Sequence, residues 1–200
     1  MTATATVRET FTFDPLEWTP WLERATETDL TPAQRERVEA YLANVPNPDY
    51  IDVLANDFPA LVARAAVHKH VYTSTDPAPS AYRELGATTT SRINGCVFCA
   101  SVHARMYANF AKQRDLAKRF LAEGVDTDLP PVERAVVDLS AKVTNDPEAL
   151  SAADLAPLRE LGFDDLTILD VINYAAFFAN ANRLMLTLGA PRKPAPPAAR

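Results

Sequence analysis

Long apolar runs are missing from this sequence, and none approaches the roughly 18 residues that suggest a membrane-spanning helix. Residues 1–9 also lack the apolar stretch of a secretory signal. These two absences predict a protein with no membrane partner and a cytoplasmic location.

An excess of positive charge is missing as well. The 20 Lys and Arg residues are outnumbered by 26 Asp and Glu residues, which gives a net charge of −6. Nucleic-acid binding needs a basic patch, and anionic membrane surfaces attract basic segments. We therefore expect neither a nucleic acid nor a membrane surface as a partner.

Cysteine is nearly absent, and the only two are Cys96 and Cys99. Their spacing makes them one C-x-x-C pair. In a reducing compartment such a lone pair is more often catalytic or metal-binding than a structural crosslink. This pair is therefore the most informative feature of the chain.

Strand-like alternation and internal repeats are also missing, and helical patterns replace them. Thr31, Pro32 and Gln34 combine an N-cap, a proline at the first helical position and a capping-box residue. The predicted helices span about 31–44, 58–72, 81–92, 96–110, 130–144, 151–161 and 164–188. The predicted fold class is all-α.

The helix predicted at 81–92 contains poor helix formers. Gly86 and the run from Thr88 to Ser91 all have low helix propensity. Burial must therefore hold this helix in place.

A length of 200 residues favours one domain with a full core. We predict a single all-helical domain over residues 1–190. The tail at 191–200 is rich in proline and lacks apolar bulk, which predicts disorder.

The last predicted helix is apolar over most of its circumference between residues 166 and 186, which predicts burial in the domain centre or in a subunit interface. Asn173 and Asn180 are then expected to be satisfied core or interface amides. Trp18 and Trp21 are expected to pin the N-terminal segment onto the core or onto a neighbouring subunit. We predict a homo-oligomer with part of residues 164–188 or the N-terminal segment in its interface.

Four residues form a candidate redox site. Cys96 is predicted near the first turn of its helix, where free backbone N–H groups favour a thiolate, and a C-x-x-C pair beside a base has a lowered pKa. Cys99 lies three residues later on the same face, and His103 follows one turn further on. The turn signal Asn94-Gly95 would fold the preceding helix back and bring Glu84 towards the imidazole. The arrangement is that of a nucleophile, a base and a group that orients the base.

Two structural alternatives compete with this interpretation. The C-x-x-C pair supplies half of a zinc site, with His103 as a third ligand and Glu84, His68 or His70 as a fourth. The cysteines could also be inert core residues. His68 and His70 are two residues apart and diverge on a helix, so we predict that both lie on the surface.

The spacing of Glu84, Cys96, Cys99 and His103 is the E-x11-C-x2-C-x3-H pattern of alkylhydroperoxidase D. The chain resembles the superfamily of that enzyme and carboxymuconolactone decarboxylase, most of all its peroxidase-related branch. The last helix, with its aromatic pair, Asn-Arg and Leu-Gly ending, and residues 131–138 resemble the family's second half. The resemblance covers roughly residues 55–190, which leaves residues 1–54 as an N-terminal extension.

The resemblance implies an all-helical bundle that assembles into homo-oligomers, commonly dimers, trimers or hexamers. It also implies a disulfide cycle without a metal or cofactor. Cys99 would attack the peroxide, and Cys96 would be the more accessible thiol that closes the disulfide and meets the reductant. Glu84 and His103 would relay protons. Phe98 stands where the family's hydroperoxidase has a second histidine.

The predicted function is therefore that of a peroxidase-type, antioxidant enzyme, a thiol-dependent hydroperoxide reductase. Its partners would be a hydroperoxide substrate and a dithiol or protein reductant. A disulfide oxidoreductase acting on a protein or a small molecule is a related alternative. An alternative from another class is a non-catalytic metal-binding or structural oligomer.

Overall fold

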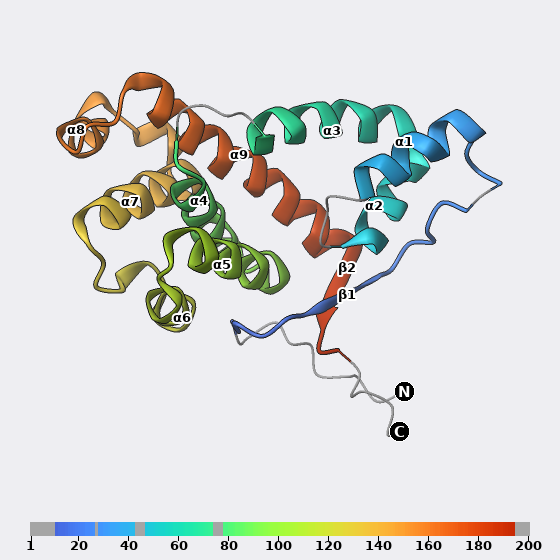
Figure 1. The fold of residues 1–200 in the computed structure, drawn as a ribbon, viewed down its shortest axis with the longest axis horizontal. Coiled ribbons are helices and arrows are strands. Elements are labelled where there is room, and N and C mark those ends of the chain that lie inside the picture. The colour runs from blue at the N-terminus through green and yellow to red at the C-terminus, as the bar shows by residue number, and fades with distance from the viewer. Residues whose placement is uncertain (1–10, 27, 43–46, 74–77, 195–200) are drawn as a thin grey trace.

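The structure, a computed structural model, describes residues 11–26, 28–42, 47–73 and 78–194 (Figure 1). The α-helices in these ranges are α1 (Pro32–Leu42), α2 (Pro48–Leu54), α3 (Phe58–Thr73), α4 (Ser80–Ile93), α5 (Val97–Ala111), α6 (Arg114–Glu123), α7 (Pro131–Asn145), α8 (Ala152–Glu160) and α9 (Asp165–Leu188). Short 3-10 segments are η1 (Ala55–Asp57), η2 (Gly124–Asp126) and η3 (Pro147–Ala149). The strands are β1 (Glu17–Pro20) and β2 (Gly189–Arg192). The predicted all-α class is confirmed.

Helix α4 lies at the centre of the bundle and packs against α5, α7 and α9. Helix α9 is long, and in Figure 1 it runs from the α7–α8 end of the molecule towards the α1–α3 end. Most predicted helices are present close to their expected bounds, including α1 with its reciprocal Thr31–Gln34 capping bonds. The sequence did not indicate α2 and α6, which are short.

Burial holds α4 together, as predicted from its poor helix formers. Thr88 and Thr89 are buried, and their hydroxyls donate to the carbonyls of Glu84 and Leu85, at 2.7 and 2.8 Å. A Cβ at Gly86 would lie 3.0 Å from the Ser140 hydroxyl of α7. The missing side chain thus allows α4 and α7 to approach closely, which fixes the helix that carries Glu84.

The two strands were not predicted. They pair antiparallel, with Trp18 opposite Pro191. A Cβ at Gly189 would collide with the Trp18 ring and the Thr19 carbonyl, so only glycine fits this crossing. The strands have four residues each and contain prolines, which hides any alternating pattern.

The predicted disordered tail at 191–200 is therefore wrong at its start, because Pro191 and Arg192 belong to β2. Arg192 also forms an ion pair with Glu17 across the strands, at 2.5 Å. Residues 195–200 lie outside the described part of the chain.

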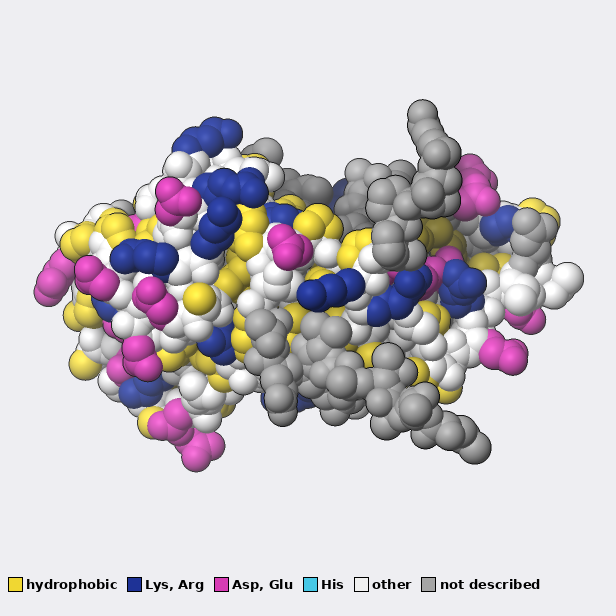
Figure 2. All heavy atoms as spheres, turned by 90° about the horizontal axis from the view of Figure 1, so that it is seen from below, with side chains coloured by type: hydrophobic (Ala, Val, Ile, Leu, Met, Phe, Trp, Pro, Cys, Tyr) yellow, Lys and Arg dark blue, Asp and Glu magenta, His cyan; other side chains and the backbone are white. Residues whose placement is uncertain are grey.

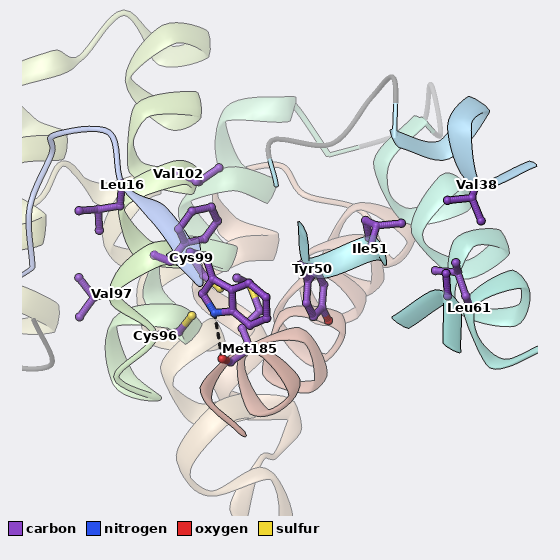
Figure 3. Packing of buried hydrophobic residues seen from close by; sticks show 13 residues of the cluster. Leu16, Val38, Tyr50, Ile51, Leu61, Cys96, Val97, Cys99, Val102 and Met185 are labelled. Carbon is purple, nitrogen blue, oxygen red and sulfur yellow. Dashed lines mark hydrogen bonds between the residues drawn. The ribbon is translucent and has the colours of Figure 1, made fainter. Parts of the chain in front are cut away.

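Strand β1 brings the N-terminal extension into the core. The Trp18 ring is buried, and its Nε1 donates to the Met185 carbonyl at 3.2 Å. The buried cluster around it contains Cys96, Cys99 and Met185, with Tyr50 facing them (Figure 3). Trp18 thus pins this segment as expected, whereas Trp21 is 56% exposed on the chain.

The surface carries mixed charge. On the face in Figure 2, basic and acidic side chains are interspersed rather than gathered into one basic stripe. Across the described ranges, no helix has the length and apolar character needed to cross a membrane.

Candidate active site

The α4–α5 hairpin brings the predicted residues together. Gly95 has a φ of +77°, a left-handed conformation that glycine adopts readily, and it closes the predicted turn. Cys96 caps α5, and its N–H donates to the Ser91 carbonyl at 2.9 Å. Cys99 therefore lies in the first turn of α5, beside the α4 helix that carries Glu84.

Glu84 and His103 form a buried pair, as the sequence predicted. The Nδ1 atom of His103 lies 2.6 Å from Oε2 of Glu84, and Tyr174 donates to Oε1 at 3.2 Å. The Phe178 ring packs against the imidazole with centroids 4.0 Å apart. Because the carboxylate holds Nδ1, Nε2 is the nitrogen left for proton transfer.

The Cys99 thiol lies among sulfur and apolar groups. Its Sγ is 3.4 Å from the Met185 Sδ. Burial, and next the neighbouring Cys96 thiol, raise the pKa of Cys99 well above its usual range, and the Asn182 amide offsets part of this. The predicted lowering of the pKa is therefore wrong for Cys99 in the reduced pair, and its ionisation needs a base.

Cys96 is not the more accessible thiol. Its exposed fraction is 2%, against 4% for Cys99, so this expectation from the resemblance is wrong. Trp18 of β1 and both Gly189 and Pro191 of β2 line the small hollow beside Cys96. The strand pair, which joins the two ends of the described chain, thus covers this thiol.

A cavity of about 70 Å³ opens beside Cys99 and His103. It is larger than the roughly 10–15 Å³ that one water needs, so it has room for a small ligand. The lining residues are Tyr41, Asn47, Tyr50, Ile51, Arg64, His68, Phe98, Cys99, Val102, His103, Phe178, Ala181 and Met185. The sequence identified Cys99 and His103, but it gave no reason to single out Tyr41, Asn47, Tyr50 or Arg64.

His68 is half-buried in the cavity wall, so its predicted surface position is wrong, whereas His70 is exposed as expected. The His68 ring lies 5.4 Å from the Phe177 ring, between centroids. Burial, and then the charges of Arg64 and His103, lower the pKa of His68 to about 4. His68 is therefore neutral at pH 7.

Asn182 is the buried amide of α9. Its Nδ2 donates to the Ser91 hydroxyl at 3.0 Å, and its Oδ1 accepts from Asn94 at 3.1 Å. It therefore ties α9 to the turn before Cys96. Asn173 and Asn180, which the sequence indicated instead, are exposed on the single chain.

Possible metal ligands do not gather here. In the part of the chain that the structure describes, no three His, Cys, Asp or Glu side chains are grouped to hold a metal ion.

Comparisons with known proteins agree with the resemblance seen in the sequence. Residues 60–117 match the Carboxymuconolactone decarboxylase family. This segment contains Glu84, Cys96, Cys99 and His103, so the resemblance to the superfamily is confirmed over the candidate site. A search of the curated proteins found no match.

Solved structures share the fold. The alkylhydroperoxidase AhpD core of a peroxidase-related protein from Ralstonia eutropha JMP134 has a TM-score of 0.74 and 24% identity, covering 84% of this chain and 90% of that chain. A peroxidase-related protein from Silicibacter sp. TM1040 has a TM-score of 0.72 and 22% identity, covering 87% and 94%. The debrominase Bmp8, as a cysteine-to-alanine variant with 2,3,4-tribromopyrrole, has a TM-score of 0.65 and 17% identity, covering 84% and 90%. The fold is thus that of the AhpD core, and it also occurs in a debrominase.

Proposed function

We propose that this protein is a thiol-dependent hydroperoxide reductase. The observation that carries the proposal is the buried Glu84–His103 pair, with Nδ1 and Oε2 2.6 Å apart, whose imidazole lines the same cavity as Cys99. A nucleophile, a base and a group orienting the base are thus gathered where a small substrate can enter. Because the fold also occurs in a debrominase, the fold does not decide the reaction, and the proposal rests on these side chains instead.

The first step is proton transfer. The raised pKa of Cys99 makes its thiolate scarce at neutral pH. His103 takes the proton, and Glu84 stabilises the resulting imidazolium. The Cys99 thiolate attacks one peroxide oxygen, the O–O bond breaks, and the leaving alkoxide takes the proton from His103. The products are an alcohol and a sulfenic acid at Cys99.

The second step closes the disulfide. The Cys96 thiol attacks the sulfenic sulfur of Cys99, and the hydroxyl leaves as water. A dithiol donor then restores both thiols by exchange and is itself oxidised to a disulfide. We place this cycle in the cytoplasm, where reduced dithiols are available. The overall reaction converts one hydroperoxide and one dithiol into an alcohol, water and a disulfide.

Free-thiol titration and intact mass test the proposal. Reduced protein given one equivalent of an organic hydroperoxide should lose both thiols and release one equivalent of alcohol. Cys96→Ser should stop at a sulfenic acid that a specific reagent traps. Cys99→Ser should leave the peroxide unconsumed.

Three outcomes contradict the proposal. Peroxide consumption by Cys99→Ser at the wild-type rate would remove Cys99 from the reaction. Stoichiometric zinc with unreactive thiols would favour the metal-binding alternative. Unreactive thiols towards peroxide, combined with rapid exchange with protein disulfides, would favour the disulfide oxidoreductase.

We also propose a homo-oligomer with the outer face of α9 in its interface. Leu166 and Leu169 are 56% and 50% exposed on this face of the single chain. Light scattering should return a multiple of 21.9 kDa, and Leu166→Glu with Leu169→Glu should reduce it. Leu161→Glu, at the end of α8, is the matched control. A wild-type mass near 21.9 kDa would contradict the assembly.

A further inference from the structure

The cavity wall formed by Asn47, Tyr50 and Arg64 carries polar groups that no atom of the described residues satisfies. The Tyr50 hydroxyl, the Asn47 Nδ2 and the Arg64 Nε are buried, and none hydrogen bonds to an atom of the described residues. Tyr50 and Asn47 are themselves only 5% and 8% exposed. A buried polar group without a partner is costly, so three in one cavity wall favour binding of a group that pairs with them.

All three groups are hydrogen-bond donors. Burial, as the main cause, raises the pKa of Tyr50 to about 12, so its hydroxyl keeps its proton. The amide nitrogen of Asn47 and the guanidinium of Arg64 can only donate. The ligand must therefore present acceptor atoms.

The charge in the cavity has one sign. No Asp or Glu is among its lining residues in the described ranges. Arg64 makes no ion pair with the carboxylates described, and its Nη1 donates to the Tyr41 hydroxyl at 2.8 Å. Since His68 is neutral at pH 7, it adds no competing charge. Arg64 is thus a cation without a counter-ion among the described carboxylates.

Aromatic rings hold this guanidinium at the cavity. Its Cζ lies 5.3 Å from the centroid of the Tyr50 ring and 5.0 Å from that of Phe177. Such stacking orients the planar donor fork and leaves its N–H edges free for an acceptor. The rest of the lining includes Ile51, Val102 and Ala181, which suit an apolar body.

We propose that the cavity selects organic anions, and that Arg64, with Tyr50 and Asn47, binds a carboxylate-like group while the apolar body of the ligand faces Cys99. The inference rests on the proposed function for its substrate class, an organic hydroperoxide that carries a carboxylate. Arg64 is then the residue that determines specificity.

Binding of an unreactive probe pair tests the anion site apart from the chemistry. Benzoate is ionised at pH 7, and benzamide is a neutral molecule of the same shape. Calorimetry on the reduced protein should find benzoate bound roughly tenfold to a hundredfold more tightly, the range for hydrogen bonds to charged groups. Equal affinities, or no binding of either probe, would overturn the inference.

Two arginine variants locate the effect. Arg64→Met keeps an apolar stem over the rings and should abolish the preference for benzoate. Arg37→Met removes an equal charge from α1, where Arg37 packs on Phe58 outside the cavity, and should keep the preference. A preference that survives Arg64→Met, or that is lost equally in both variants, would overturn the role of Arg64.

A reactive pair links the site to catalysis. Cumene hydroperoxide is neutral, and its para-carboxylated derivative is anionic. Arg64→Met should raise KM for the anionic peroxide roughly tenfold or more relative to KM for the neutral peroxide.

The two proposals fail differently. If the protein prefers benzoate but neither peroxide oxidises the thiols, the proposed hydroperoxide reductase activity is contradicted and the proposed anion site is supported. If both peroxides oxidise the thiols equally well and benzoate binds no more tightly than benzamide, the anion site is contradicted and the reductase activity is supported.

Discussion

The two sides of the cavity differ in how their polar groups are satisfied. On the reaction wall, formed by Cys99 and His103 with Glu84 behind them, the His103 imidazole is hydrogen bonded to the Glu84 carboxylate, which also accepts from Tyr174. On the recognition wall, formed by Asn47, Tyr50 and Arg64, buried donors have no partner in the described chain. Internal bonds thus fix the reacting groups, whereas the facing wall keeps donors that, in our proposal, bind the ligand.

Loss of the Glu84 carboxylate should disable the reaction wall. Glu84→Gln removes the group that stabilises the His103 imidazolium, so the thiolate reaction should slow roughly a hundredfold or more near neutral pH. Because the pKa of Cys99 is raised, the thiolate fraction rises with pH, and much of the rate should return in alkaline buffer. Thiol alkylation and peroxide consumption followed across neutral and alkaline pH measure this.

Three comparisons sharpen that experiment. His103→Ala should slow the thiolate reaction to a similar extent. The double variant should react only slightly more slowly than either single variant, because the effects of residues that act as a unit are not additive. Glu133→Gln is the control, since this buried carboxylate bonds Gln113 away from the thiols. Wild-type rates in Glu84→Gln at every pH would make Glu84 purely structural.

Asn182→Leu should weaken the support of the reaction wall. It leaves the buried Ser91 hydroxyl and the Asn94 amide without their partner, which should lower the free energy of unfolding by about 1–3 kcal/mol. Asn180→Leu on the exposed side of the same helix should change it by less than about 0.5 kcal/mol. Chemical denaturation measures both, and equal effects would remove the special role of Asn182.

His68→Phe tests how burial in the cavity lining beside the recognition wall affects stability at different pH values. The folded-state pKa of His68 is lowered from 6.5 to about 4, so the unfolded state binds more protons within this window. Wild-type stability should therefore fall as pH drops from 6.5 towards 4, and the fall should be smaller in the variant. Unfolding free energies on both sides of the window measure this. His70→Phe, at an exposed position, should lose as much unfolding free energy as the wild type over the same pH window.

Tyr41→Phe should have the smallest effect. It removes the hydroxyl that accepts from Arg64 at 2.8 Å and so loosens the guanidinium without removing its charge. Affinity for benzoate should fall a few-fold, equivalent to about 0.5–1 kcal/mol. Tyr82→Phe, outside the cavity lining, is the control. A loss as large as that of Arg64→Met would mean that the hydroxyl itself contacts the ligand.

The same two walls show what could be predicted from the sequence. Cys96, Cys99, His103 and Glu84 were found because local spacing and one tight turn decide their proximity. The recognition wall was missed because Asn47 and Arg64 come from segments whose approach depends on tertiary packing.

Two further differences have the same origin. The C-x-x-C pair beside a base suggested a low pKa for Cys99, but burial among Met185 and its neighbours raises this pKa instead. The β1–β2 pairing could not be predicted from local sequence, because the two strands lie at opposite ends of the described chain.

That pairing has a consequence for how the protein is made. The Trp18 to Met185 bond spans 167 positions, so it forms only after Met185 has been synthesised. Contacts this distant in sequence form late, because the closure entropy must be overcome first. The helical hairpin that carries the cysteines can fold much earlier from local contacts. During biosynthesis the Cys96 thiol is therefore uncovered at first and accessible to oxidants and to disulfide exchange with other chains, until β1 and β2 pair and Trp18 and Gly189 cover it.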